Sequence, residues 1–337
     1  MPNRKISLEI KHFPVMLDKV IEICSPAKGG VYLDCTFGGG GYSEKILKFS
    51  KTKVIALDRD KYTLEHAKIL KKKYPKRFSF FQKKFSDLDS VTTGHEIDVV
   101  IFDLGLSSFQ LKNLKRGFSF NSKDSLDMSM GLTKVSAEQV INECNEHKLK
   151  LILKILGEEK EANRIVKNII KFRAIKRITK VNQLVEIIER SKKKDYSKKI
   201  NPCTKTFQAI RMFVNKELTE LFEGLIKAAK ILKPGGKILI ISFHSLEDKM
   251  IKFFFNNFSS NRPQTSRYFP ENDQSENFLF EKYKNKIFKP TSSEIAKNFP
   301  SRSAKLRFAV RNSNKFTFPQ DFTVKFKKYL ELESSHV

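Results

Sequence analysis

The stretch Val31-Tyr-Leu-Asp-Cys-Thr-Phe-Gly-Gly-Gly-Gly-Tyr-Ser43 decides the fold. Its first five residues predict a strand, its four glycines predict a tight turn, and a helical pattern begins near Ser43. Glycine lets the backbone approach a ligand because no Cβ intervenes, and the amides that open a helix favour a polar or anionic group. Glycine runs also occur in flexible linkers, but the flanking strand and helix favour a site for a nucleotide or a nucleotide-like cofactor.

An acid follows the second predicted strand at the spacing of a nucleoside site. Residues 54–57 predict that strand, which ends at Asp58-Arg59-Asp60. Eighteen residues separate Gly40 from Asp58, close to the spacing at which an acid meets the ribose hydroxyls of a nucleoside. Either acid is also compatible with a simple cap of the helix predicted over 61–73. Both roles can coexist, with Asp58 on the ribose and Asp60 as the cap.

Strand patterns alternating with helical patterns predict an α/β fold with a parallel, doubly wound sheet. Further strands are expected over 78–81, 97–102 and 237–243, and an antiparallel pair over 278–289 and 305–311 closes the sheet. Such sheets bind ligands at the carboxyl ends of their strands. The residues predicted at that edge are Gly38, Gly39, Gly40, Gly41, Asp58, Phe85 and Asp103.

A basic helical segment interrupts this alternation. Residues 1–108 and 206–312 are expected to form the cofactor-binding domain, residues 109–205 a helical insertion on the substrate side, and residues 313–337 a C-terminal appendage. The insertion carries basic runs over 166–180 and 190–199, which are compatible with solvated faces or with a nucleic-acid clamp.

Two segments after the insertion carry candidate substrate contacts. A long helix is expected over 206–232, on which Gln208, Arg211 and Asn215 share a polar face that either is solvated or contacts substrate. The fifth strand ends at His244, and Ser245 with Asp248 has the spacing of a capping box, which favours a cap over a nucleophile.

Composition points to a polyanionic partner. Lys and Arg outnumber Asp and Glu by 65 to 37 in 337 residues, a net charge of +28, although a lysine-rich composition alone can produce such an excess. The four cysteines are scattered, which argues against a zinc site or a disulfide framework and for a reducing compartment. No long apolar run is present, so we expect a cytoplasmic protein that contacts no membrane.

These parts favour group transfer from a nucleoside cofactor. No P-loop lysine follows the glycines and no metal-ligand cluster is apparent, which disfavours ATP chemistry. S-adenosylmethionine fits, with its methionine end on the glycine loop, its ribose on Asp58, its adenine near Phe85 and its methyl group near Asp103. A nicotinamide dehydrogenase and a catalytically silent RNA-binding or assembly factor remain as alternatives.

An ordered set of motifs resembles the bacterial small-subunit ribosomal RNA cytosine-N4 methyltransferase family over roughly residues 6 to 311. The motifs are His12-Phe-Pro-Val-Met-Leu17, Asp34-Cys-Thr-Phe-Gly-Gly-Gly-Gly-Tyr-Ser43, Asp103-Leu-Gly-Leu-Ser-Ser108, Arg116-Gly-Phe-Ser-Phe120, Leu126-Asp-Met128, Gly157-Glu-Glu159, Thr206-Phe-Gln-Ala-Ile-Arg211, Asn215-Lys-Glu-Leu218 and Ile241-Ser-Phe-His-Ser-Leu-Glu-Asp248.

The resemblance implies a class I S-adenosylmethionine-dependent methyltransferase fold, Rossmann-like with a mostly parallel seven-stranded sheet and an inserted all-helical domain. It implies S-adenosylmethionine as donor and, as acceptor, the N4 amine of a cytidine in the decoding region of 16S ribosomal RNA within the small (30S) subunit. Oligomeric state does not follow from it.

Site residues carry over by position. The family's cofactor contacts fall on Gly40, Gly41, Tyr42, Asp58, Phe85, Asp103 and Gln110. The expected RNA-side residues are Gln208, Arg211, Asn215 and Arg302. Asp103, or the backbone carbonyl after it, is expected to accept a hydrogen of the cytosine amine, with His244 as the other catalytic candidate, and no metal is expected. The chain has Tyr42 where the family usually has His, Phe109 where it has Pro, and Asn298-Phe-Pro-Ser-Arg302 in place of an Asn-Pro-Arg run.

Overall fold

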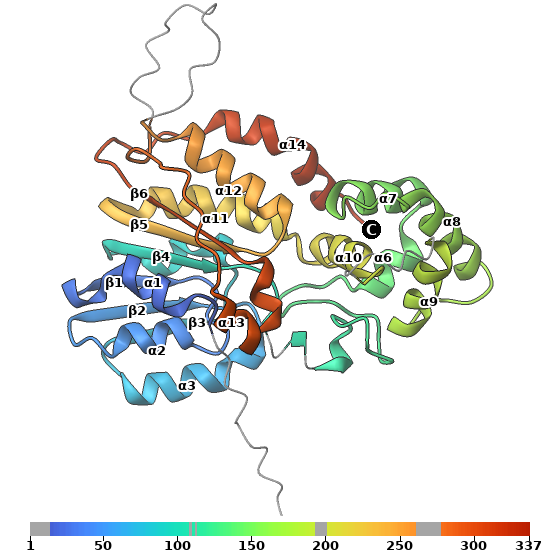
Figure 1. Cartoon of the computed structure of the whole chain (residues 1–337), viewed down its shortest axis with the longest axis horizontal. Coiled ribbons are helices and arrows are strands. Elements are labelled where there is room, and N and C mark those ends of the chain that lie inside the picture. Colours follow the sequence, from blue (N-terminus) through green and yellow to red (C-terminus); the bar gives the residue numbers. More distant parts are fainter. Residues whose placement is uncertain (1–13, 108–109, 112, 193–200, 261–277) are drawn as a thin grey trace, which may run out of the picture.

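The computed structural model describes residues 14–107, 110–111, 113–192, 201–260 and 278–337. A helix-flanked sheet occupies one side of the molecule and a group of helices, α6 to α10, occupies the other (Figure 1). Within these described ranges, no helix is long and apolar enough to span a membrane.

Six strands form one sheet in the order β3-β2-β1-β4-β5-β6. Their bounds are β1 (Gly30–Asp34), β2 (Thr52–Leu57), β3 (Phe78–Phe81), β4 (Ile97–Asp103), β5 (Leu232–Ser242) and β6 (Lys305–Val310). The first five pair in parallel and β6 runs antiparallel to β5. The predicted doubly wound parallel sheet is confirmed, and the carboxyl ends of β1, β2 and β4 lie at one edge.

The described residues form six strands rather than the expected seven. The segment predicted as a strand over 278–289 makes isolated bridges instead, antiparallel ones between Phe280 and Arg311 and between Phe288 and Leu306, and a parallel one between Phe280 and Ser259. Asn285 between them has a φ of 49°, a left-handed conformation that interrupts an extended chain. Its side chain accepts a hydrogen bond from Arg307 of β6 at 2.8 Å, so this segment follows the sheet edge without continuing it.

Helices cover both faces of the sheet. One face carries α1 (Leu17–Cys24), α2 (Gly41–Leu47) and α3 (Leu64–Lys73), and the other carries α4 (Asp89–Thr92), α11 (Glu217–Ile231), α12 (Ser245–Asn257) and α14 (Gln320–Ser334) (Figure 1). Side chains alternate along each strand because successive Cβ atoms point to opposite faces. Tyr32 of β1 accordingly packs in the core on the α2 side, and Leu33 packs in the core on the α11 side.

The described part of the insertion is mostly irregular over residues 117–136 and mostly helical from Ala137 onward. It contains α6 (Ala137–Glu143), α7 (Glu146–Leu151), a π-helical turn (Ile152–Leu156), α8 (Ala162–Arg173) and α9 (Val181–Ser191). Helix α8 ends at Arg173, so the basic run predicted over 166–180 extends beyond it, and residues 193–199 of the second basic run lie outside the described residues. The insertion also contains the short helix η4 (Leu114–Arg116), and short helices outside it are η1 (Pro26–Lys28), η2 (Lys61–Thr63), η3 (Phe85–Asp87), α13 (Ser292–Lys297) and η7 (Phe299–Ser303).

The long helix expected over 206–232 is two helices. α10 (Thr204–Asn215) ends and α11 begins at Lys216, whose φ of 52° and ψ of 44° are left-handed. On either side of the break, long-range contacts replace helical hydrogen bonds. The side chain of Asn215 binds the backbone of residues 128 and 130, and Glu333 of α14 accepts hydrogen bonds from the amides of Leu218 and Thr219.

The C-terminal segment, expected as an appendage, belongs to the core of the sheet-bearing part. Phe322 of α14 stacks on Phe222 of α11 at 4.6 Å between ring centroids and packs on Phe254 of α12 at 4.9 Å. Both aromatic contacts are buried, as is Glu333, which accepts hydrogen bonds at the first turn of α11. Residues 320–334 therefore hold α11 against α12.

Candidate active site

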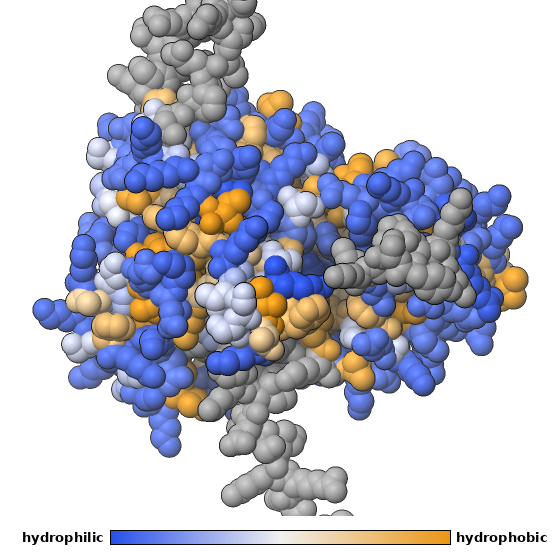
Figure 2. Space-filling view, viewed as in Figure 1, coloured by the Kyte–Doolittle hydropathy of each residue, from blue (hydrophilic) through white to orange (hydrophobic). Residues whose placement is uncertain are grey.

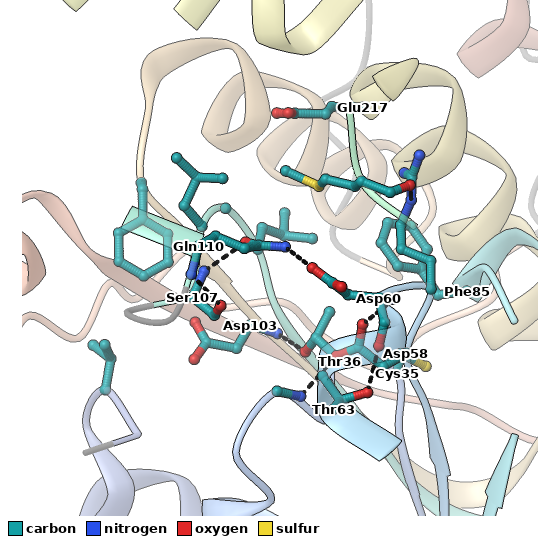
Figure 3. A pocket seen from close by; sticks show the side chains of 18 of the residues that line it. Cys35, Thr36, Asp58, Asp60, Thr63, Phe85, Asp103, Ser107, Gln110 and Glu217 are labelled. Carbon is teal, nitrogen blue, oxygen red and sulfur yellow. Dashed lines mark hydrogen bonds between the residues drawn. The ribbon is translucent and has the colours of Figure 1, made fainter. Parts of the chain in front are cut away.

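A pocket opens where β1, β2 and β4 end, at the edge that the sequence predicted. Four of the predicted cofactor residues line it, and they are Asp58, Phe85, Asp103 and Gln110 (Figure 3). The other three, Gly40, Gly41 and Tyr42, lie beside it without lining it. Besides residues of β2, β4 and the glycine loop, the pocket lining includes residues of α11 and of the segment that contains Asn298, Pro300 and Ser301.

Within the glycine run, Gly38 borders the pocket. Its φ is 52°, and a Cβ built there would have as its nearest neighbour the carbonyl oxygen of Thr36 at 3.9 Å, so the space beside it is open. A Cβ at Gly40 would lie 2.7 Å from the ring of Phe37, and one at Gly41 would lie 2.6 Å from Pro14. Gly38 is therefore the glycine of this run that lets the backbone approach a ligand closely. Gly40 and Gly41 are required because the protein packs tightly against them.

Asp58 joins the glycine loop to the end of β2. Its Oδ2 accepts a hydrogen bond from the amide of Gly38 at 2.8 Å and its Oδ1 accepts one from the amide of Asp60 at 2.8 Å. Burial raises the pKa of Asp58 to about 6, against the effect of these two amides. Each carboxylate oxygen keeps a lone pair for a ligand hydroxyl.

The ring of Phe85 forms an apolar wall of the pocket. It meets Phe102 edge to face at 5.4 Å between centroids. Gly224 of α11 lies against it so closely that a Cβ there would come within 2.9 Å of Phe85 Cδ2. The strand β4 and helix α11 therefore fix the orientation of this ring.

Asp103 ends β4 with one oxygen unsatisfied. Its Oδ2 lies 3.1 Å from the hydroxyl of Tyr42, which also donates to the carbonyl of Val15 at 2.6 Å. Oδ1 is buried and has no hydrogen-bond partner among the described residues. Burial raises the pKa of Asp103 to about 8, although the hydrogen bond from Tyr42 acts in the opposite direction. At neutral pH the apo protein thus holds Asp103 mostly protonated.

Asp60 has a larger role than the cap expected from the sequence. It does cap η2, accepting from the amide of Tyr62, and its Oδ2 also accepts from Gln110 Nε2 at 2.9 Å and from Arg116. Gln110 Oε1 in turn accepts from the amide of Ser107 at 2.9 Å (Figure 3). The sequence signal for this role of Asp60 is its place in the run 58–60. That run does not show the partners of Asp60, which lie 50 and 56 residues further along the chain.

Asn215, which the sequence places among the expected RNA contacts, is buried and hydrogen-bonded within the protein. Its side chain is 1% exposed, donates to the carbonyl of Met128 at 2.8 Å and accepts from the amide of Met130 at 2.8 Å. Arg59 reaches the same place, donating to the carbonyls of Met130 and Asn215. This network holds the 128–133 loop against the pocket, and Asn215 has no atom left for a substrate.

The other expected RNA-side residues differ in accessibility. Arg211 is 14% exposed and donates two hydrogen bonds of 2.8 Å to Glu217, a pocket residue, so it reaches a substrate only through the pocket. Gln208 is half-buried, with its Nε2 3.7 Å from Met212 Sδ. Arg302 is exposed next to the pocket-lining Ser301.

His244 caps α12 in place of the expected Ser245. Its Nδ1 accepts from the amide of Glu247, whose own side chain accepts from the amides of Phe243 and His244. Burial opposes ionisation of Glu247, but His244 and the amide of Phe243 outweigh it and lower its pKa. Ser245 instead donates its hydroxyl to Glu158 at 2.8 Å.

Glu217, His244 and Glu247 have ligand atoms within 4.8 Å of one another, the spacing of a metal site. The hydrogen bonds argue for a different use. Both Glu217 oxygens accept from Arg211, and an Nδ1 that accepts from an amide places the imidazole proton on Nε2, 3.1 Å from Glu247 Oε1. A protonated ring nitrogen is no metal ligand. The sequence pointed to His244, which is not among the residues that line the pocket, but not to Glu217, Glu220 or Glu247, which line it.

Comparison with known proteins gives a consistent result. The model of the MraW methylase family matches residues 9–312. The chain is 41% identical over 304 residues to the Ribosomal RNA small subunit methyltransferase H of Ehrlichia canis, covering 89% of this chain and 99% of that protein. It is 41% identical over 302 residues to the protein of the same name from Rickettsia typhi, covering 89% and 98%, and 38% identical over 311 residues to that of Brucella ovis, covering 91% and 89%.

Proposed function

Since the chain belongs to the MraW methylase family, we propose that it methylates the N4 amine of a cytidine in the decoding region of small-subunit ribosomal RNA, with S-adenosylmethionine as donor. The observation that carries the proposal is the pocket of Asp58, Phe85 and Asp103 in a chain that matches this family over residues 9–312. The relatives' names supply the substrate class, small-subunit ribosomal RNA. Cytosine N4 and the decoding region are the finer part of the proposal.

The pocket residues suit the donor. S-adenosylmethionine supplies a methyl group on a positively charged sulfur. Asp58 has free lone pairs for ribose hydroxyls, and Phe85 offers an apolar face for the adenine. Asp103 can carry a negative charge toward the positive end of the cofactor. Gln110 lines the same pocket, and Gly40, Gly41 and Tyr42 would contribute through the glycine loop.

The acceptor amine needs help from the protein, because its lone pair is delocalised into the cytosine ring. A group that accepts an amine hydrogen pulls electron density toward nitrogen and removes the proton that the methylated amine must lose. Asp103 Oδ1 is buried, unpartnered and beside the pocket, which supports it as that acceptor. His244 is the second candidate, and its Nε2 could accept an amine hydrogen only after passing its own proton to Glu247, whose Oε1 lies 3.1 Å away. Proximity and exclusion of water supply the remainder of the rate enhancement.

The RNA must present an unstacked cytidine, which costs a few kcal/mol. The net charge of +28 supports phosphate contacts that offset this cost. We assign these contacts to the helical segment 109–205 together with Gln208, Arg211 and Arg302, and the cofactor to residues 1–108 and 206–312. We also propose that the substrate lies within the 30S particle and that the protein is cytoplasmic.

The test is methyl transfer from labelled S-adenosylmethionine to small ribosomal subunits that lack the modification. Label in the 16S RNA is expected with the intact protein and is expected to be lost in Asp103→Ala. Calorimetry with S-adenosylmethionine and with NAD runs beside it. Tight NAD binding without S-adenosylmethionine binding would show a dehydrogenase, and binding of RNA with no label transfer would show a silent assembly factor.

A further inference from the structure

An exposed aromatic ring lies at the mouth of the pocket. Phe299 opens η7 and is 64% exposed. The residues around it, Asn298, Pro300 and Ser301, line the pocket. Single exposed apolar side chains are common on protein surfaces and by themselves need no explanation. The position of Phe299 distinguishes it, because its neighbours on both sides in the chain line the pocket.

A cation covers one face of this ring. The guanidinium carbon of Arg302 lies 4.2 Å from the centroid of the Phe299 ring, and Arg302 Nη1 donates to the carbonyl of Phe299 at 3.2 Å. Since Arg302 takes one face, the large exposed fraction of Phe299 belongs to the opposite face and the ring edge. The pair therefore offers a flat apolar surface beside a positive charge.

The backbone under the pair is fixed. Ser301 is fully buried, its hydroxyl donates to the carbonyl of Asn298 at 2.7 Å, and the amide of Ala304 donates to the carbonyl of Ser301 at 2.8 Å. The preceding helix α13 is tied to the start of α1, because Glu294 accepts a hydrogen bond from the amide of Met16 at 2.6 Å. A ring on such a loop loses little conformational entropy when it binds a partner.

The surroundings suit a polar polymer rather than an apolar protein partner. α13 crosses in front of the sheet edge in Figure 1, and in Figure 2 a few apolar side chains beside it are bordered by hydrophilic ones. Lys297 and Arg302 carry positive charge on either side of Phe299. Such a mixture of an aromatic ring with cations is typical of single-stranded nucleic-acid binding.

We propose that Phe299 and Arg302 form a stacking site for the nucleobase that flanks the target cytidine, with Arg302 also near its phosphate. The inference rests on the proposed function. A target base that enters the pocket leaves its neighbour without a stacking partner on one side, and the exposed face of Phe299 replaces that partner. Arg302 strengthens the site because a guanidinium is attracted both to the ring and to phosphate.

Fluorescence tests the stacking directly, because the chain contains no tryptophan. Phe299→Trp introduces a single reporter, and a stacked nucleobase quenches it. The control is Phe318→Trp at another exposed phenylalanine, 47% exposed and not part of the pocket lining. Titration with oligocytidylate is expected to quench Phe299→Trp and to leave Phe318→Trp unchanged. No quenching at position 299, or equal quenching at both positions, would overturn the proposal.

Kinetics with small ribosomal subunits separate stacking from mere apolar contact. Phe299→Ala is expected to raise KM for the subunits roughly five- to 150-fold, the range for loss of one stacked base. The dissociation constant of S-adenosylmethionine should stay unchanged. Phe299→Tyr should retain the wild-type KM, and Phe299→Leu should behave like Phe299→Ala. A Leu variant that equals Tyr, or an unchanged KM in the Ala variant, would contradict stacking. A wild-type protein that labels no cytidine would instead refute the proposed function, while the fluorescence titration would still test the stacking site.

Discussion

The affinity for S-adenosylmethionine should depend on pH through Asp103. Burial raises the pKa of this carboxyl to about 8, so it is mostly neutral at pH 7 in the apo protein. The positive sulfur of the cofactor favours the ionised form, and the proton must leave when the cofactor binds. Each pH unit below the raised pKa then costs about 1.4 kcal/mol, which is about a tenfold loss of affinity. Affinity should rise with pH and level off above about 8.

Calorimetry from about pH 6.5 to about pH 9.5 measures this dependence in the wild-type protein and in Asp103→Asn. The α-amino group of the cofactor titrates near pH 7.7–8.0, but it does so equally with both proteins. The pKa of Asp58, about 6, lies below the window. The ratio of the two dissociation constants therefore isolates Asp103.

Tyr42→Phe gives an independent check of the same reasoning. Its hydroxyl lies 3.1 Å from Asp103 Oδ2 and lowers the pKa of that carboxyl against the effect of burial. Removal of the hydroxyl should shift the rise in affinity to higher pH. A wild-type dissociation constant that parallels that of Asp103→Asn at every pH, or a shift to lower pH in Tyr42→Phe, would refute the argument.

Three further predictions concern stability and substrate binding. Glu333→Ala should lower the free energy of unfolding in urea by about 2–3 kcal/mol, because two amides and a hydroxyl of α11 lose their acceptor. As a control, substitution of the exposed Glu331 by Ala should change it by less than about 0.5 kcal/mol. Equal effects of the two substitutions would contradict the role of α14. Gly131→Ala should weaken cofactor binding and lower the free energy of unfolding by more than Gly94→Ala, for which about 1–2 kcal/mol is expected. Both glycines have positive φ, but of the two only Gly131 has a backbone oxygen in the way of a Cβ, at 1.7 Å. Similar losses of stability in the two variants would contradict the packing of this loop. Asn215→Ala should lose about 2–3 kcal/mol of stability with an unchanged KM for small subunits, and a raised KM at full stability would restore it as an RNA contact.

The sheet and its ligand-binding edge could be predicted because local pattern determines them. A strand, a glycine turn and a helix follow one another within residues 31–47, and parallel strands carry their carboxyl ends to one edge. The sequence therefore placed Asp58 at the pocket by its spacing from the glycines and Asp103 by its position at the end of a strand, and the structure brings both there.

Features that depend on contacts between residues far apart in the chain could not be predicted from the sequence. The break at Lys216 results from Asn215, bound to a loop about 85 residues earlier, and from Glu333, which lies 115 residues after Leu218. A polar residue at helical spacing looks the same whether it faces solvent or a buried loop, so the burial of Asn215 could not be predicted from the sequence. The interrupted strand over 278–289 has the same kind of cause, because the conformation of Asn285 is fixed by Arg307.

Nucleoside mass spectrometry of the labelled 16S RNA tests the central claim most directly. Small subunits that lack the modification are incubated with the protein and S-adenosylmethionine, and the digested RNA is compared with N4-methylcytidine and 5-methylcytidine standards. The account predicts that the label appears in N4-methylcytidine and is absent after incubation with Asp103→Ala. Label in 5-methylcytidine or another nucleoside, or no label with a protein that binds S-adenosylmethionine, would contradict it.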